Sequence, residues 1–212
     1  MTTIAPRAIP SNGGFSLVDL LVGVSLSLLG MGTILSFHRS QLYAVQDQAR
    51  QVEIQTTTRA IVDLFAREAR RAGLNPACTA NFAMVADASA SQVRFQEDLN
   101  SNGVLDAASE DITYRFAQSN RVERATGTST DTLLSNVDLT GSRMRYFDGG
   151  GVELVPSPTL SAAQRTAIRR VRIEVSASSA ARNPSRSAPL TARAATDVEL
   201  RNRFFVITNS CP

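Results

Sequence analysis

The sequence predicts an α+β protein in which one long N-terminal α-helix packs on an antiparallel β-sheet. Three observations lead to this class: an apolar run near the N-terminus, a helical pattern that continues from it, and period-two alternation in the second half of the chain. The 212 residues divide into four expected segments. These are a leader at 1–14, a membrane-spanning half-helix at 15–38, an amphipathic half-helix at 39–73 and a β-rich head at 74–212.

The apolar run from Phe15 to Phe37 is long enough to cross a bilayer, because about 20 apolar residues suffice for a helix. It contains one charged residue, Asp19. A secretory signal would have a shorter apolar stretch followed by small residues, whereas here Gly13 and Gly14 precede the run. The run is therefore expected to stay in the protein as a membrane anchor.

Asp19 is the unusual residue of this run, because a carboxylate inside a membrane span costs roughly 2.5–3.5 kcal/mol. If the chain is cut after Gly14, Phe15 gains an α-amino group and Asp19 becomes the fifth residue. Its carboxylate can then pair with the N-terminal amine of a neighbouring subunit. Alternatively, it is tolerated at the membrane edge, where the helix dipole favours a negative charge. The residues alone leave both interpretations open.

The helical pattern continues past the apolar run, with apolar residues at 3–4 spacing as far as Ala72. Gly73 is placed to end this helix, with Arg70 and Arg71 in its last turn. A kink near Gly30 and Gly32 would instead divide it into two helices, with little consequence for function.

Alternating apolar residues predict strands through the rest of the chain. The expected strands lie around Val93–Phe95, Ile112–Phe116, Arg143–Phe147, Val152–Val155, Val171–Val175 and Thr196–Ile207. We also expect a turn at 148–151, a short helix within Leu160–Arg169, and a mobile loop at Ser176–Pro189, which is rich in Ser, Ala, Arg and Pro.

Residues 13–22 (GGFSLVDLLV) resemble the class III signal of type IV prepilins and type II secretion pseudopilins. The resemblance implies that prepilin peptidase cuts after Gly14, that Phe15 becomes the N-methylated first residue, and that Asp19 takes the assembly role that Glu usually has. The shorter Asp is one departure from the family pattern. The absence of the usual helix-breaking Pro is another.

Two later segments also resemble this family. Residues 65–74 (FAREARRAGL) look like the end of the long helix in PilW-type minor pilins, and residues 168–175 (IRRVRIEV) are similar to their late strand. The resemblance implies a pilin fold and a structural, non-enzymatic role in priming the assembly of a type IV pilus. It also makes the tip of the pilus a candidate location for the protein. J-type pseudopilins of type II secretion share this plan. Two more interpretations stay open: a pilin head that binds DNA or a surface, and an uncleaved membrane anchor.

The same resemblance implies the partners and the location of the protein. The partners are other minor pilins and the major pilin through the long helix, prepilin peptidase, the inner membrane and a tip adhesin. The head would be periplasmic while the helix spans the inner membrane once, and it would reach the cell surface in the assembled pilus. Cys78 and Cys211 are expected to form a disulfide outside the cytoplasm, the alternative being two unrelated thiols.

One loop has the spacing of a calcium site. Oxygen-bearing groups at positions one, three, five, seven and nine, with Gly at six, match an EF-hand loop, in which position seven binds through its carbonyl. The candidate ligands are Asp98, Asn100, Asn102, Val104 and Asp106. Position twelve is Ser109, and the nearest carboxylate is Glu110, so the usual bidentate ligand is missing. A hairpin turn at Asn102-Gly103 is the alternative.

Composition argues against other functions. The net charge of +3 and the scattered acidic residues give no clean basic stripe, so a nucleic-acid partner is not favoured, although every basic residue is Arg. The single His, His38, lies at the expected membrane boundary. The sequence indicates no catalytic residues, and calcium is the one cofactor that it suggests.

Overall fold

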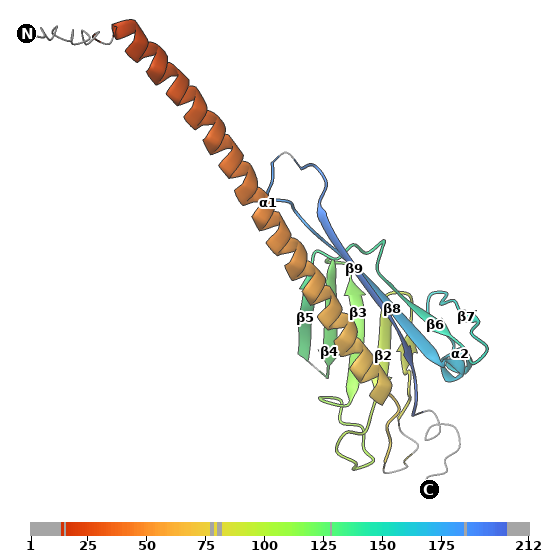
Figure 1. Cartoon of the computed structure of the whole chain (residues 1–212). Coiled ribbons are helices and arrows are strands. Elements are labelled where there is room, and N and C mark those ends of the chain that lie inside the picture. The colour runs from red at the N-terminus through yellow and green to blue at the C-terminus, as the bar shows by residue number, and fades with distance from the viewer. Residues whose placement is uncertain are drawn as a thin grey trace, which may run out of the picture. The chain divides into compact units, whose positions relative to one another are not determined.

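The computed structural model describes Gly14, residues 16–76, Thr79, and residues 82–127, 129–184 and 186–202. One long helix is followed there by nine strands and a short second helix (Figure 1), which confirms the predicted α+β class. The chain forms two units, Met1–Val45 and Gln46–Pro212, and each is described by itself.

Helix α1 runs from Leu17 to Arg71 as one element and passes through Gly30 and Gly32 without a break. It ends as the sequence predicts. Gly73 adopts a φ of 76°, a left-handed conformation that suits glycine, and its N–H donates to the carbonyl of Gln96 at 2.7 Å. The Asn202 amide adds a cap that the sequence did not indicate, because Nδ2 donates to the carbonyls of Arg70 and Arg71 at 3.2 and 3.1 Å.

The part of α1 in the first unit exposes its apolar side chains. From Leu17 to Phe37 the large apolar residues are between 49% and 74% exposed. This segment is long and apolar enough to cross a membrane. No described residue of the first unit buries it.

The five-stranded antiparallel sheet has the order β1-β2-β3-β4-β5. Its strands are β1 (Asp87–Ala88), β2 (Gln92–Gln96), β3 (Asp111–Ala117), β4 (Arg121–Thr126) and β5 (Ser129–Ser135). The sequence predicted β2 and β3 but missed the other three. In β4 a register shift between Val122 and Glu123 breaks the period of two, and β5 is a mostly exposed edge strand without an apolar face.

The four-stranded sheet, also antiparallel, has the order β7-β6-β8-β9. Its strands are β6 (Arg143–Phe147), β7 (Glu153–Leu154), β8 (Arg170–Ser179) and β9 (Leu190–Glu199), and helix α2 (Ala162–Ala167) precedes β8. The prediction of a single sheet was therefore incomplete. The two sheets meet through bonds such as the Met144 N–H to the Ala90 carbonyl at 2.8 Å, which no local pattern encodes.

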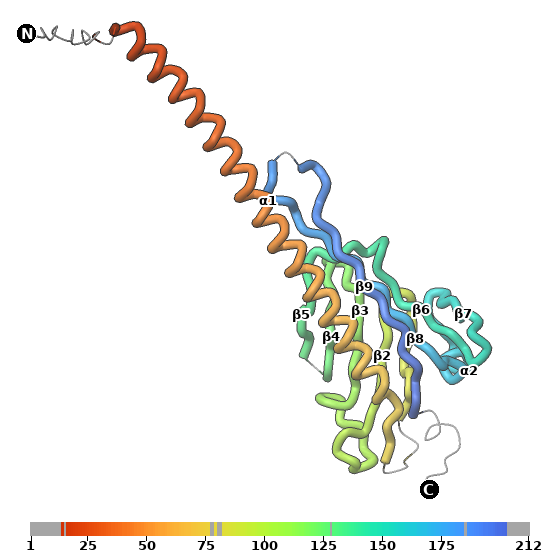
Figure 2. The backbone as a smooth tube through the Cα atoms, in the orientation of Figure 1, coloured from red at the N-terminus to blue at the C-terminus, as the bar shows by residue number. Residues whose placement is uncertain are grey.

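The β8–β9 hairpin corrects two boundaries (Figure 2). The predicted loop at Ser176–Pro189 was wrong at its start, because β8 continues to Ser179. The last strand begins at Leu190 and ends at Glu199, earlier than the predicted Thr196–Ile207, and residues 203–207 lie outside the described part. Ser176 and Ala177 are buried, so small residues here pack in a strand where composition alone suggested a loop.

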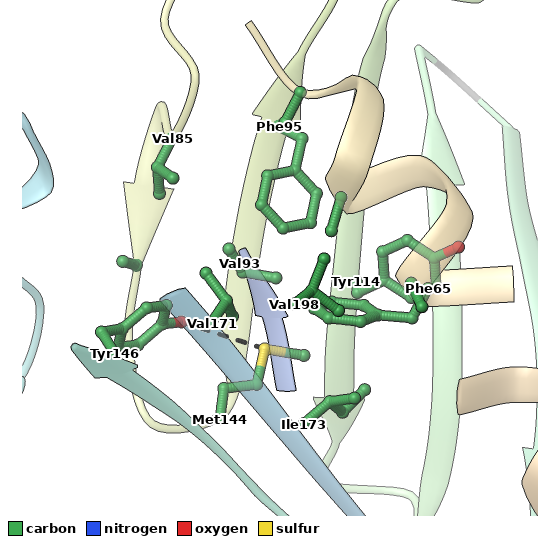
Figure 3. Close-up of a cluster of buried hydrophobic side chains, with 14 of the residues drawn as sticks. Phe65, Val85, Val93, Phe95, Tyr114, Met144, Tyr146, Val171, Ile173 and Val198 are labelled. Atoms are coloured by element: carbon green, nitrogen blue, oxygen red, sulfur yellow. Dashed lines mark hydrogen bonds between the residues drawn. The ribbon is translucent and has the colours of Figure 1, made fainter. Parts of the chain in front are cut away.

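The core joins both sheets and the second half of α1 (Figure 3). Phe65 of α1 is fully buried, with its ring centroid 5.6 Å from that of Phe95 on β2 and 5.1 Å from that of Tyr114 on β3. Val171 and Ile173 from β8 extend the same cluster. The helix face that packs here is therefore an integral part of the head.

Candidate functional site

The N-terminal residues of the proposed cleavage site lie at the edge of the described chain. Gly14 is exposed, and a Cβ added there would meet no atom within 4 Å. Packing in this chain therefore gives no reason for glycine at position 14. Phe15, the expected first residue of the mature protein, lies outside the described residues.

Asp19 takes part in a cap at the start of α1. Its Oδ2 accepts the Ser16 N–H at 3.2 Å, while the Ser16 Oγ accepts the Val18 N–H at 3.3 Å. This reciprocal arrangement is close to a capping box and satisfies N–H groups that a helix start leaves open. The Ser-x-x-acid spacing could have revealed it in the sequence. The Asp19 side chain is exposed, so a group from outside the chain can still reach its carboxylate.

A buried ion pair joins α1 to the five-stranded sheet. Arg124 of β4 donates to the Glu68 carboxylate, with Nη2 2.8 Å from Oε1, and the Tyr114 hydroxyl also donates to Glu68. Glu68 is 6% exposed and Tyr114 is fully buried. Burial, and then the hydrogen bond to Glu68, raise the pKa of the Tyr114 hydroxyl, which stays protonated as a donor. The cluster fixes the position of α1 on the sheet.

A second acidic side chain, Glu97, lies at the end of α1. It is 1% exposed and pairs with Arg71, whose Nε is 3.1 Å from Oε2. Burial raises the pKa of Glu97, and the charge of Arg71 opposes this shift. Burial dominates because Arg71 itself is half exposed.

The predicted calcium loop forms as a chain of backbone-capping turns. The Asp98 carboxylate accepts the N–H groups of Asn102 and Gly103 at 3.2 and 3.1 Å, and Asn102 Oδ1 accepts the Val104 N–H at 2.7 Å. Asn100 Oδ1 accepts the Asn102 N–H at 3.0 Å. Side-chain oxygens from alternate residues thus accept backbone N–H groups along the loop, and Gly103, with a φ of 72°, makes the sharp bend.

Glu110 closes the same loop from the next turn. Its Oε1 accepts the Leu99 N–H at 2.9 Å and its Oε2 accepts the Asp106 N–H at 2.8 Å, while the residue is fully buried. Among the described residues no group of three or more His, Cys, Asp and Glu side chains could hold a metal ion. A cation in this loop would therefore depend on amide and carbonyl oxygens in addition to the carboxylates of Asp98 and Asp106.

The arginines of the four-stranded sheet are largely paired with acids. Arg143 bonds to Glu174 at 2.9 Å, and Arg145 Nε bonds to Glu153 at 2.8 Å. Arg170 and Arg172 of β8 are paired as well, with Asp197 at 3.7 and 3.5 Å. Cys78 and Cys211 lie outside the described residues.

A long helix with an exposed apolar half, and a head built on the other half, define a pilin-like protein of the α+β class. The family model described as "Prepilin peptidase-dependent protein B" matches residues 47–196, and the chain belongs to that family. This finding confirms the resemblance to prepilin-like minor pilins. No curated protein and no solved structure matches the chain.

The matched range begins at Asp47 and thus excludes the N-terminal motif. The head and the N-terminal segment are therefore separate lines of evidence for one class of protein. The head resembles the family in its own right, whereas residues 13–22 resemble the processing signal.

Proposed function

We propose that this chain is a minor pilin of a type IV pilus that helps to prime assembly of the filament and is located at its tip. The protein would be anchored in the inner membrane through the first half of α1, with a periplasmic head, and would then be extracted into the filament. Its role would be structural, with no chemistry performed by the head.

The exposed apolar half of α1 is the observation that carries the proposal. Burying a large apolar side chain is worth about 1.5–3 kcal/mol, so a row of exposed ones needs an apolar environment. A bilayer offers this before assembly, and the helices of neighbouring subunits offer it afterwards. A family whose description names dependence on prepilin peptidase supports this sequence of events.

Cleavage of the leader would create the amino group that pairs with Asp19 during assembly. Cleavage after Gly14 would leave Phe15 with a free and then methylated amine, and Asp19 would pair with the amine of a neighbouring subunit. The exposed Asp19 carboxylate supports this role, although it also caps its own helix through the Ser16 N–H. The cap would hold the carboxylate in place before a partner arrives.

Asp19 variants separate capping from assembly. Asp19→Asn keeps an oxygen that can accept the Ser16 N–H but removes the charge, whereas Asp19→Glu keeps the charge. We expect Asn to abolish incorporation into filaments and Glu to retain it, measured by immunoblotting of sheared filaments. Equal incorporation of both variants would contradict the pairing role. Ser16→Ala is the matched control, because it weakens the cap and leaves the charge.

A J-type minor pseudopilin of a type II secretion system is the alternative assembly. Deletion of the gene that encodes this chain tests it, with surface pili counted and secreted proteins measured in the same cells. Loss of pili with normal secretion is expected. Normal pili with lost secretion would assign the chain to the secretion system instead. Binding of the intact protein to DNA at low salt tests whether the head is a DNA-binding module.

A disulfide between Cys78 and Cys211 and a weak calcium site at residues 98–106 remain proposals for the head. The first would tie the C-terminus to the segment after α1. The second is supported by the side-chain oxygens of Asp98, Asn100 and Asn102, which recur along one turn of the loop and accept its backbone N–H groups. Prepilin peptidase, other pilins and a tip adhesin are the proposed partners.

A further inference from the structure

The loop between β8 and β9 is hydrogen-bonded to the helical residues at the start of the second unit. The Asp47 carboxylate accepts the Arg182 N–H at 2.6 Å, and Arg50 Nη1 donates to the Ala180 carbonyl at 3.2 Å. Gln51 Nε2 donates to the Thr191 carbonyl at 2.7 Å, at the start of β9. The hairpin therefore reaches the end of this unit at which the chain arrives from the apolar run (Figure 1).

This loop carries positive charge and has no acidic residue of its own. No acidic residue occurs between Glu174 and Asp197, whereas Arg182 and Arg186 are both exposed. Neither arginine forms an ion pair within the described part of the chain. The acid that bonds to the loop backbone, Asp47, is 6% exposed, so it does not face solvent.

Chain length keeps the loop close to the membrane boundary. The apolar run ends at Phe37, ten residues before Asp47. Ten residues span about 15 Å as a helix and about 35 Å when fully extended. The intervening residues 38–46 contain Arg39 and no acid. Residues 37–47 are helical in α1, so the Asp47 bond to the loop lies about 15 Å along the helix from the end of the apolar run.

We propose that Arg182 and Arg186 bind the anionic phospholipid headgroups of the membrane that the apolar run spans, before the protein enters a filament. Exposed arginines near such a surface are attracted by its negative potential, and the attraction falls off within a Debye length. The three bonds to Asp47, Arg50 and Gln51 would hold the loop beside the part of α1 that follows the apolar run. This inference rests on the membrane anchoring in the proposed function.

The absence of Trp from the chain allows a direct test. Ser187→Trp places one fluorophore beside Arg186, and Leu99→Trp places one in the exposed loop that follows β2. Each full-length variant is reconstituted in vesicles of phosphatidylcholine, or of phosphatidylcholine with phosphatidylglycerol. Lipids brominated close to the headgroup then quench any Trp that approaches the surface.

We expect quenching of Trp at 187 only in vesicles that contain phosphatidylglycerol, and none at 99. Arg182→Gln with Arg186→Gln should lower the bound fraction, with roughly a 10–30-fold loss in the binding equilibrium from two arginines. Arg121→Gln, at an exposed arginine of β4, should leave it unchanged. About 1 M salt should release the loop, because the Debye length falls to about 3 Å.

Equal quenching in the two vesicle types, or quenching that survives loss of both arginines, would overturn the inference. So would the absence of quenching at 187 in protein that is fully inserted. Failure of the full chain to enter vesicles at all would instead contradict the membrane anchor. Protease protection of the apolar segment distinguishes that result from failure of the loop alone.

Discussion

The two halves of α1 share one secondary structure and differ in what stabilises them. Before Val45 the large apolar side chains are mostly exposed, whereas in the second half Ile61, Val62 and Phe65 are at most 4% exposed. Hydrogen bonds within a helix do not distinguish these halves. The difference lies in what removes apolar surface from water: the head covers the second half, whereas no described residue covers the large apolar side chains of the first.

The two halves of α1 also differ in the environment of their acidic residues. The second half buries Glu68 against Arg124 and Tyr114, so a charge there specifies how the helix sits on the sheet. The first half has one acidic residue, Asp19, which is exposed and close to the helix start. One charge serves the fold, and the other is available for an interaction with a second molecule.

The largest expected effect comes from truncating the packed aromatic of the second half. Phe65→Ala should lower the free energy of unfolding by about 3–5 kcal/mol, because a cavity forms beside Phe95 and Tyr114. Leu28→Ala, at a side chain that is 65% exposed, should change it by less than about 0.5 kcal/mol. Urea unfolding of the full chain in detergent measures both. Similar losses would remove the distinction between the halves.

Breaking the buried ion pair should have the next largest effect. Glu68→Gln leaves Arg124 without its carboxylate, and the cost should be about 3 kcal/mol, at the lower end for buried pairs because Arg124 is partly exposed. Glu53→Gln on the exposed face of α1 is the control and should be close to neutral. If the two variants unfold at the same urea concentration, Glu68 does not fix the helix on the sheet.

Glu97 and Glu153 should respond to pH in opposite directions. Burial raises the pKa of Glu97 in the folded protein, so the folded state binds more protons and stability falls as pH rises above the ordinary glutamate range. The hydrogen bond from Arg145 lowers the pKa of Glu153, so its contribution is present at neutral pH and is lost on acidification.

Urea midpoints at pH 4 and pH 7 measure both effects. Compared with wild type at the same pH, the urea midpoint of Glu97→Gln should be higher at pH 7 than at pH 4. The midpoint of Glu153→Gln, compared in the same way, should be lower at pH 7 than at pH 4. The Glu153 effect should be the smaller one, because that pair is exposed to solvent. If the midpoints of both variants shift in the same direction between pH 4 and pH 7, the opposite pKa directions of Glu97 and Glu153 are contradicted.

Calcium should give the smallest effect. A weak site with a dissociation constant of roughly 10⁻⁴–10⁻³ M would stabilise the head by less than about 2 kcal/mol at millimolar calcium. A thermal melt with and without calcium measures it, with magnesium as the control ion. Asp106→Asn, which removes a charge but keeps an oxygen, should reduce the shift. No shift in the wild type would argue against the site.

The sequence predicted the features that have local causes. The end of α1 at Gly73, the turn at 148–151 and strands β2, β3, β6 and β8 follow from residue preferences and periodicity. The pairing of Ser16 with Asp19 also has a local signal, the Ser-x-x-acid spacing, although the predicted role of Asp19 did not include a cap.

Features with distant causes could not be predicted. The separation into two sheets depends on contacts such as Met144 with Ala90, which are far apart in the chain. Glu68 lies among Arg67, Ala69 and Arg70 and has the pattern of a surface residue, so nothing local indicates that Arg124 and Tyr114 bury it. The hydrogen bond between Asp47 and the β8–β9 loop likewise has no signal in the Ser- and Ala-rich sequence of that loop.

The claim that the first half of α1 survives maturation to meet another molecule can be tested by one measurement. Mass spectrometry of the N-terminal peptide, from protein extracted from membranes of cells with prepilin peptidase, gives the first residue and its modification. We expect a chain that begins at methylated Phe15 and retains the whole apolar run. A chain that still begins at Met1 or Thr2, or one cut after Phe37, would contradict it.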